Sequence, residues 1–225
     1  MRTEASIDSA PTLHPPHEVP MHIPPRQVTL AVPVSALDHR SGPEHAAVTV
    51  VEYADFECPS CVAAEPATRL LRNAHHDDVL FAFRHFPLED VHPQALMAAE
   101  AAEAAAAQGR FWEMHDKLLA NSPRLTRHHL EAYASELALD LPRFKAELDD
   151  EIYRQRIREH QQGGHLSHLR ATPTFFVNGI VQDVSGGMSA LFARVRDVLT
   201  YQSASPSGPH RIASDRSAPG LARHR

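Results

Sequence analysis

Residues 48–61 read VTVVEYADFECPSC, an apolar and β-branched run that leads into the two cysteines Cys58 and Cys61. The run is apolar at almost every position, which predicts a central strand covered by helices on both faces. Pro59 suits the first position of a helix, where its missing N–H leaves no group unpaired and its φ is already helical. The stretch therefore predicts a buried strand followed by a helix whose first turn carries both cysteines.

These two residues are the only cysteines in the chain, and their spacing is typical of dithiol redox chemistry. Two sulfurs in the first turn of a helix lie close enough to form a disulfide. The unpaired N–H groups and the positive dipole end of a helix N-terminus stabilise a thiolate and lower its pKa. We therefore expect Cys58 to be the more exposed, attacking thiol and Cys61 to be the buried, resolving thiol.

Glu52 interrupts the apolar strand six residues before Cys58. One interpretation is a buried acid with a raised pKa that relays a proton to or from Cys61. The other is a side chain that reaches solvent at the edge of the sheet.

The cysteines themselves also have two competing interpretations, half of a zinc site or inert core residues. A closed zinc site needs four ligands, and no second CxxC or spaced Cys/His pair follows, so no metal site is predicted. Small core residues would have no need of a position between a strand and a helix, which favours the redox interpretation.

The two ends of the chain differ in composition from its middle. Residues 1–40 are rich in proline and residues 202–225 in serine, proline and arginine, without a helical or strand period, which predicts disordered segments. Residues 41–201 are long enough for one domain with its own core. A net charge of −6, without a block of Lys or Arg, gives no basis for nucleic-acid binding. No stretch approaches 18 apolar residues and residues 1–8 lack the apolar core of a secretory signal, so we expect a cytoplasmic protein without a membrane span. An exported mature form, with its signal removed, stays open as the alternative.

The hydrophobic pattern predicts the order strand, helix, strand, helical insert, hairpin, helix. We expect the first helix over 60–72 and the second strand over 79–86, which stops at Pro87. From residue 93 to about 170 the period is helical, with Gly109 bending or dividing an Ala-rich helix and Asp140 as an N-cap. The dipeptide Asn178-Gly179 between two apolar runs indicates a hairpin, and residues 188–199 predict a closing helix.

Three stretches together resemble the DsbA-like thiol-disulfide oxidoreductases of the thioredoxin superfamily: residues 50–61, residues 84–88 (RHFPL) and residues 172–179 (TPTFFVNG). The resemblance covers about residues 41–200. It implies an α/β, thioredoxin-like fold with a helical insertion between the second strand and the C-terminal β-hairpin. It also implies a cis peptide bond before Pro173, which would face the cysteines, and it matches Glu52 to the family's buried strand acid. Thr172 and Pro173 would then bind the backbone of an extended substrate.

The resemblance implies an enzyme that exchanges disulfides with protein or peptide thiols and needs no bound organic cofactor. Its redox partner would be a thioredoxin, glutathione or a membrane quinone-linked system. Ser60 stands where the periplasmic members have histidine, which predicts a less stabilised Cys58 thiolate and a less oxidising couple, as suits a cytosolic reductase or isomerase. Two alternatives stay open, a glutathione-dependent transferase or isomerase on the same scaffold and a non-enzymatic chaperone or interaction module.

Overall fold

The structure is a computed structural model that describes residues 28–204, and its centre is a five-stranded sheet. The strand order is β1-β3-β2-β4-β5. The two long strands, β2 (Val48–Ala54) and β3 (Val79–His85), are parallel neighbours, whereas all other neighbouring pairs are antiparallel. The shorter strands are β1 (His39–Ser41), β4 (Thr174–Val177) and β5 (Ile180–Gln182).

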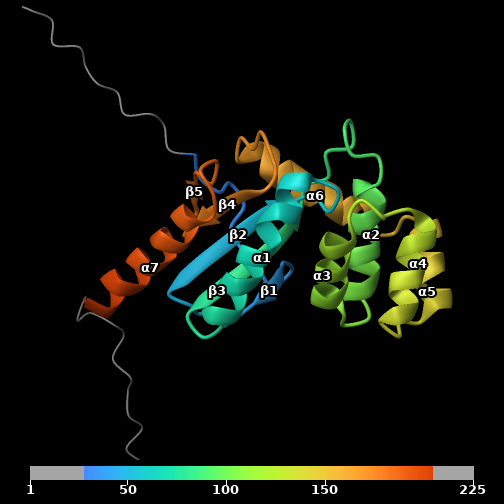
Figure 1. Cartoon of the computed structure of the whole chain (residues 1–225), viewed down its shortest axis with the longest axis horizontal. Coiled ribbons are helices and arrows are strands. Elements are labelled where there is room, and N and C mark those ends of the chain that lie inside the picture. The colour runs from blue at the N-terminus through green and yellow to red at the C-terminus, as the bar shows by residue number, and fades with distance from the viewer. Residues whose placement is uncertain (1–27, 205–225) are drawn as a thin grey trace, which may run out of the picture.

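Helices cover the sheet unevenly. Two helices, α1 (Pro59–Ala74) and α7 (Ser189–Ala204), lie on one face of the sheet (Figure 1). The chain between β3 and β4 forms the helical insert of α2 (Ala95–Ala106), α3 (Phe111–Asn121), α4 (Arg127–Glu136), α5 (Leu141–Asp149) and α6 (Arg154–Leu166). This order confirms the predicted α/β, thioredoxin-like fold with a helical insertion before the C-terminal hairpin.

Local sequence signals explain where several elements end. Gly109 has φ of +75° and separates α2 from α3, so it divides the Ala-rich helix. The side chain of Asp140 accepts a hydrogen bond from the backbone N–H of Arg143 at 3.0 Å and caps α5 as expected. Asn178 and Gly179 both have positive φ, +49° and +78°, and they close the β4–β5 hairpin.

The strand β2 is buried on both faces. Val48 and Val50 pack into the main hydrophobic core with Leu71 of α1, whereas Val51 and Tyr53 pack into a smaller cluster on the opposite face. Because side chains alternate along a strand, Glu52 points to the same face as Val50, beneath α1. The sheet thus places the one acid of this strand under the helix that carries the cysteines.

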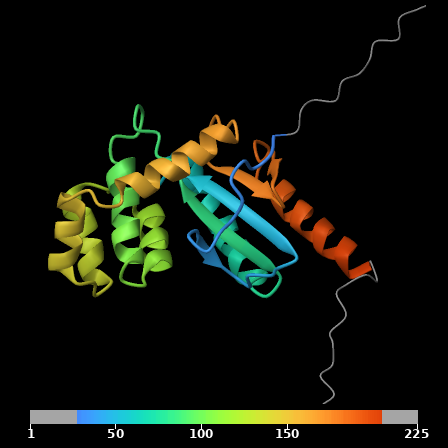
Figure 2. The same cartoon turned by 180° about the vertical axis from the view of Figure 1, so that it is seen from behind.

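The segment 28–41 is part of the fold, although the sequence pattern assigned residues 28–40 to the N-terminal arm. It crosses the face of the sheet opposite α1 (Figure 2), where Thr29 forms a bridge with Ile180 and β1 pairs with β3. The tail predicted from residue 202 is helical at its start, because α7 continues to Ala204. The rest of the predicted arm and of the predicted tail lie outside the described residues.

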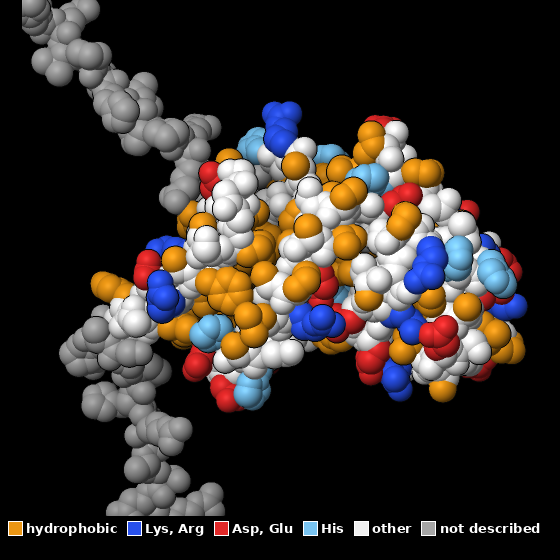
Figure 3. Space-filling model, viewed as in Figure 1, with side chains coloured by type: hydrophobic (Ala, Val, Ile, Leu, Met, Phe, Trp, Pro, Cys, Tyr) orange, Lys and Arg blue, Asp and Glu red, His pale blue; other side chains and the backbone are white. Residues whose placement is uncertain are grey.

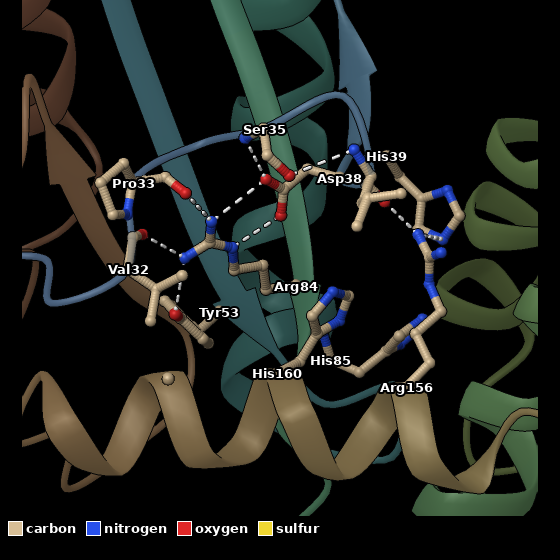
Figure 4. Close-up of polar contacts among 12 residues, drawn as sticks. Val32, Pro33, Ser35, Asp38, His39, Tyr53, Arg84, His85, Arg156 and His160 are labelled. Atoms are coloured by element: carbon tan, nitrogen blue, oxygen red, sulfur yellow. Dashed lines mark hydrogen bonds and ion pairs between the residues drawn. The ribbon is translucent and has the colours of Figure 1, made fainter.

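A buried arginine fastens this segment to the sheet (Figure 4). Arg84 of β3 pairs with Asp38 through Nε at 2.7 Å and Nη2 at 3.1 Å, and it also donates to Tyr53 Oη at 2.9 Å. Its remaining hydrogen bonds go to the carbonyl oxygens of Val32 and Pro33. The proline-rich composition of segment 28–41 did not predict this arrangement, because Arg84 and Tyr53 come from strands far along the chain.

Among residues 28–204, no helix combines the length and the apolar character that crossing a bilayer requires.

Candidate active site

Cys58 and Cys61 flank the start of α1. Cys58 has an extended backbone, with φ of −70° and ψ of 121°, and its carbonyl oxygen accepts the first helical hydrogen bond from Val62. Pro59 occupies the first helical position, as its fixed φ requires. Both cysteines are unpaired and buried, Cys58 being 7% exposed and Cys61 1%. Cys58 is therefore the more accessible thiol, although by a narrow margin.

The pKa values of the two thiols shift in opposite directions. The hydrogen bond from the Cys61 side chain lowers the pKa of Cys58 to about 5 against the effect of burial, with help from the Thr172 side chain and from the N–H groups of Cys61 and Ser60. Burial raises the pKa of Cys61 well above its usual value, and the neighbouring Cys58 raises it further. At neutral pH this arrangement provides one thiolate and one thiol.

The loop before β4 lies against the attacking position. Sγ of Cys58 is 3.4 Å from the carbonyl oxygen of Thr172, and the Thr172–Pro173 peptide bond is cis. Thr172 is 6% exposed, so its backbone oxygen lies beside the sulfur in a sheltered position. The structure thus brings together Cys58, Cys61, Thr172 and Pro173 from two segments more than 100 residues apart.

Glu52 is 2% exposed on the central strand, between β3 and β4, so the interpretation that its side chain reaches solvent at a sheet edge is wrong. Burial raises the pKa of Glu52 to about 8, and the charge of Glu65 adds to the rise. Its Oε2 has no hydrogen-bond partner within residues 28–204, and its charge is one of those that raise the pKa of Cys61. Glu52 is therefore close enough to Cys61 to sense its ionisation.

A second buried acid, which the sequence analysis missed, follows Cys61 by one helical turn. Glu65 lies on the same buried face of α1, where burial raises its pKa to about 7 although Arg72 opposes the rise. Arg72 donates to Glu65 at 3.2 Å and to Asp116 of α3 at 2.8 Å. The i, i+4 spacing from Cys61 was the available signal.

Asp55, also missed, organises the turn between β2 and α1. Its side chain is fully buried and accepts hydrogen bonds from the N–H of Glu57 and Leu88, both at 2.8 Å, and from His92 Nδ1 at 2.7 Å. Its own N–H points at Sγ of Cys61 at 3.4 Å. These hydrogen bonds tie the loop after β3 to the cysteine turn. A local sequence pattern does not predict such a long-range contact.

A groove opens beside the cysteine turn. Its volume is about 530 Å³, and its walls come from the first turns of α1, from residues 171–174, and from the segment between β5 and α7. Apolar side chains gather on this face of the molecule around α1 and α7 (Figure 3). Such a surface can hold an extended apolar peptide next to Cys58.

Two clusters within residues 28–204 contain enough donor atoms for a metal ion. In the first, His39, His85 and Glu103 meet at one carboxylate oxygen, to which Arg156 also donates at 2.9 Å. In the second, composed of Glu65, His115 and Asp116, the cation is Arg72. A guanidinium in each cluster already balances the carboxylate charge, so both resemble buried ion-pair networks.

A family model described as thioredoxin matches residues 35–191. The chain belongs to the thioredoxin family. Solved structures with the same fold include oxidised BdbD from Bacillus subtilis, at a TM-score of 0.64 and 23% identity over 72% of this chain and 93% of that one. The alpha-DsbA1 protein from Wolbachia pipientis gives a TM-score of 0.64 at 18% identity over 76% of this chain and 95% of that one. The expected thioredoxin-like fold is thereby confirmed, and these DsbA-type structures share it.

Closer relatives in sequence are much longer proteins. This thioredoxin-family chain is 49% identical over 182 residues to a protein named Na⁺/H⁺ antiporter NhaA 3 from Salinispora tropica, a match that covers 80% of the chain and 28% of the relative. The NhaA antiporter from Herminiimonas arsenicoxydans is 43% identical over 143 residues, 64% of the chain and 22% of the relative. The chain thus spans about a quarter of the length of these relatives.

Proposed function

We propose that the chain is a thiol-disulfide oxidoreductase that exchanges disulfides with protein or peptide thiols. The observation that carries the proposal is the placement of two unpaired thiols at the start of one helix, with Sγ of Cys58 3.4 Å from the carbonyl oxygen of Thr172. The lowered pKa of Cys58, about 5, and the raised pKa of Cys61 support it. In the reducing direction, the Cys58 thiolate attacks a substrate disulfide and releases one substrate thiolate. Cys61 then loses its proton and attacks Sγ of Cys58, which releases the second substrate thiolate and leaves a Cys58–Cys61 disulfide.

Glu52, Thr172 and Pro173 complete the proposed machinery. Glu52 accepts the proton of Cys61 during resolution, for which its pKa of about 8 is well matched. Thr172 and Pro173 hold the backbone of an extended substrate, which the position of the Thr172 oxygen beside Cys58 supports. Pro59 and Ser60 form the short turn that keeps both sulfurs at the helix start.

Trapping the mixed disulfide tests this proposal. The Cys61→Ser variant, mixed with a peptide disulfide, should form a covalent complex through Cys58 that mass spectrometry detects. The Cys58→Ser variant is the matched control and should form none. If neither variant forms a complex, or if both do so equally, the proposed roles of the two cysteines are wrong.

Single and double variants of the two cysteines also separate the alternative functions. A glutathione-dependent transferase or isomerase would keep activity on small electrophiles and show none on protein dithiols. A chaperone module would protect clients fully with both cysteines changed to serine. Loss of disulfide exchange in Cys58→Ser, with no client protection remaining, favours the oxidoreductase.

We propose a cytoplasmic location and, as redox partner, a thioredoxin, glutathione or a membrane quinone-linked system. Thiol trapping in intact cells tests this: a mostly reduced Cys58/Cys61 pair supports a cytoplasmic reductase, and a mostly oxidised pair contradicts it.

The long relatives suggest a second, compatible role. We propose that the redox state of this domain regulates a membrane Na⁺/H⁺ antiporter, because a protein named for that activity carries a region 49% identical to it. The test is Na⁺-driven proton exchange by the Salinispora tropica relative in vesicles, measured under oxidising and under reducing conditions. Equal exchange under oxidising and reducing conditions would contradict a regulatory role.

A further inference from the structure

His92 lies in the loop between β3 and α2, which stands beside the start of α1 (Figure 1). Hydrogen bonds at both ends tie this loop to the cysteine turn. The N–H of Leu88 donates to Asp55 at 2.8 Å, and the N–H of Gln94 donates to Glu57 at 2.6 Å. Between them, Nδ1 of His92 lies 2.7 Å from Oδ2 of Asp55.

Asp55 fixes the orientation of the imidazole. Its carboxylate is fully buried and can only accept, so Nδ1 of His92 carries the proton and Nε2 points away from Asp55. The side chain of His92 is 17% exposed, and Nε2 has no hydrogen-bond partner among the residues that the structure describes. The dyad therefore presents a free imidazole nitrogen at the edge of the active site.

The charges around His92 favour its protonated form. Burial acts to lower the pKa of His92, but the hydrogen bond and charge of Asp55 outweigh it, and the charges of Cys58 and Glu57 add to the rise. Interaction between two titrating groups is reciprocal. If the Cys58 thiolate stabilises the imidazolium, the imidazolium must stabilise the thiolate by the same free energy.

Resting on the proposed function, we propose that His92, positioned by Asp55, is the cation that stabilises the Cys58 thiolate in this enzyme. It takes the role that a histidine at the neutral Ser60 would otherwise fill. Reduction of the disulfide consumes two electrons and one proton and yields the Cys58 thiolate and the Cys61 thiol. His92 stabilises that product and so makes the couple more oxidising than Ser60 alone predicts.

The reciprocity gives a direct test on the unmodified protein. NMR titration of His92 should give a higher pKa in the reduced protein, where Cys58 is a thiolate, than in the oxidised protein, where it is neutral. Reduced Cys58→Ser should match the oxidised value. An equal His92 pKa in the reduced and oxidised proteins overturns the proposal.

The His92→Gln variant gives the converse test. It should raise the pKa of Cys58 and lower the equilibrium constant for oxidation of a dithiol about tenfold, which corresponds to about 30 mV in reduction potential. The matched control is His76→Gln, because His76 lies beyond the far end of α1, with its side chain 68% exposed and paired with Asp77. A folded His92→Gln variant with unchanged Cys58 pKa and potential contradicts the proposal.

The NMR and thiol pKa measurements need no peptide or protein substrate, so they separate this inference from the proposed function. A chain that shows the coupling between His92 and Cys58 but never exchanges disulfides with peptides refutes the proposed function alone. A chain that exchanges disulfides without the coupling refutes the role of His92 alone.

Discussion

Cys58 and Cys61 are three positions apart, yet their pKa values shift in opposite directions because their surroundings differ. Cys58 receives hydrogen bonds from Cys61 and from the N–H groups at the helix start, whereas Cys61 lies inside the helix against the core. The lowered pKa makes Cys58 the more reactive thiol at neutral pH, because the thiolate is the nucleophile.

Alkylation measures this difference directly. We expect Cys58 to react with iodoacetamide at a rate that rises with a midpoint near pH 5, following the lowered pKa. Cys61, measured in the Cys58→Ser variant, should react only under alkaline conditions. Mass spectrometry at a series of pH values checks both rates, and similar rates at neutral pH would contradict the assignment.

Glu52 makes a second prediction at this scale. As a general base it must be ionised, so resolution should accelerate as pH rises through its pKa of about 8. Glu52→Gln should slow this step on the order of 100-fold and shift the rise toward the higher pKa of Cys61. Stopped-flow measurement of mixed-disulfide decay gives the profile, and an unchanged profile would exclude the role.

The elements around the site are held together by contacts that differ greatly in burial. The Arg84–Asp38 pair, which fastens segment 28–41 to β3, has side chains only 3% and 4% exposed. Removing one partner of a buried pair leaves an uncompensated charge, which costs much more than the loss of a surface pair.

Asp38→Ala should therefore destabilise the protein by about 3 kcal/mol. The matched control is Glu44→Ala, which removes the partner of Arg40 from a pair whose Glu44 side chain is 65% exposed and should cost less than about 0.5 kcal/mol. Urea unfolding compares the two variants. Equal destabilisation would show that the Arg84 network does not fasten the segment.

Sequence alone reached most of these elements. The apolar run of β2, the glycine between α2 and α3, and the Asn178-Gly179 turn act through neighbours in the chain, and the structure has them where expected. β1 was not predicted because three residues in a proline-rich context carry no period, and their pairing with β3 depends on residues some 40 positions away.

At the scale of the whole molecule, buried ionisable groups link stability to pH. Glu52 stays protonated in the folded protein up to about pH 8, whereas in the unfolded chain it ionises near 4.5. The raised pKa therefore stabilises the fold fully only below pH 4.5, and stability is lost as pH rises from there through 8. Glu65, with a pKa of about 7, acts in the same direction.

A variant with both cysteines changed to serine isolates this effect from thiol titration. Its free energy of unfolding should fall between pH 6.5 and 8.5, by about 2 kcal/mol from Glu52 alone. Adding Glu52→Gln should flatten the curve in this window. Urea titrations at each pH check it, and a curve that Glu52→Gln leaves unchanged would mean that Glu52 ionises normally.

Only part of the active site could be predicted from the sequence, because several of its charged groups meet through contacts between distant segments. The spacing of Cys58 and Cys61 predicted their role, and the family resemblance predicted that of Pro173. Asp55 and His92 meet only because the loop after β3 folds back onto the cysteine turn, and Glu65 meets Arg72 and Asp116 across two helices. The electrostatic environment of this site therefore depends on tertiary contacts, which local sequence patterns do not predict.

The central claim is a reversible two-electron dithiol couple with one thiolate at neutral pH, and equilibrium with glutathione at several pH values tests it most directly. We expect one reversible transition between the dithiol and the Cys58–Cys61 disulfide. In the His92→Gln variant, where no imidazole beside Asp55 takes up a proton on reduction, the pKa of Cys58 is expected to remain below about 6 and that of Cys61 is raised. One proton then accompanies two electrons, and the potential of this variant should fall by about 30 mV per pH unit between pH 6 and 8. A slope of about 59 mV, or no reversible disulfide, would contradict the account.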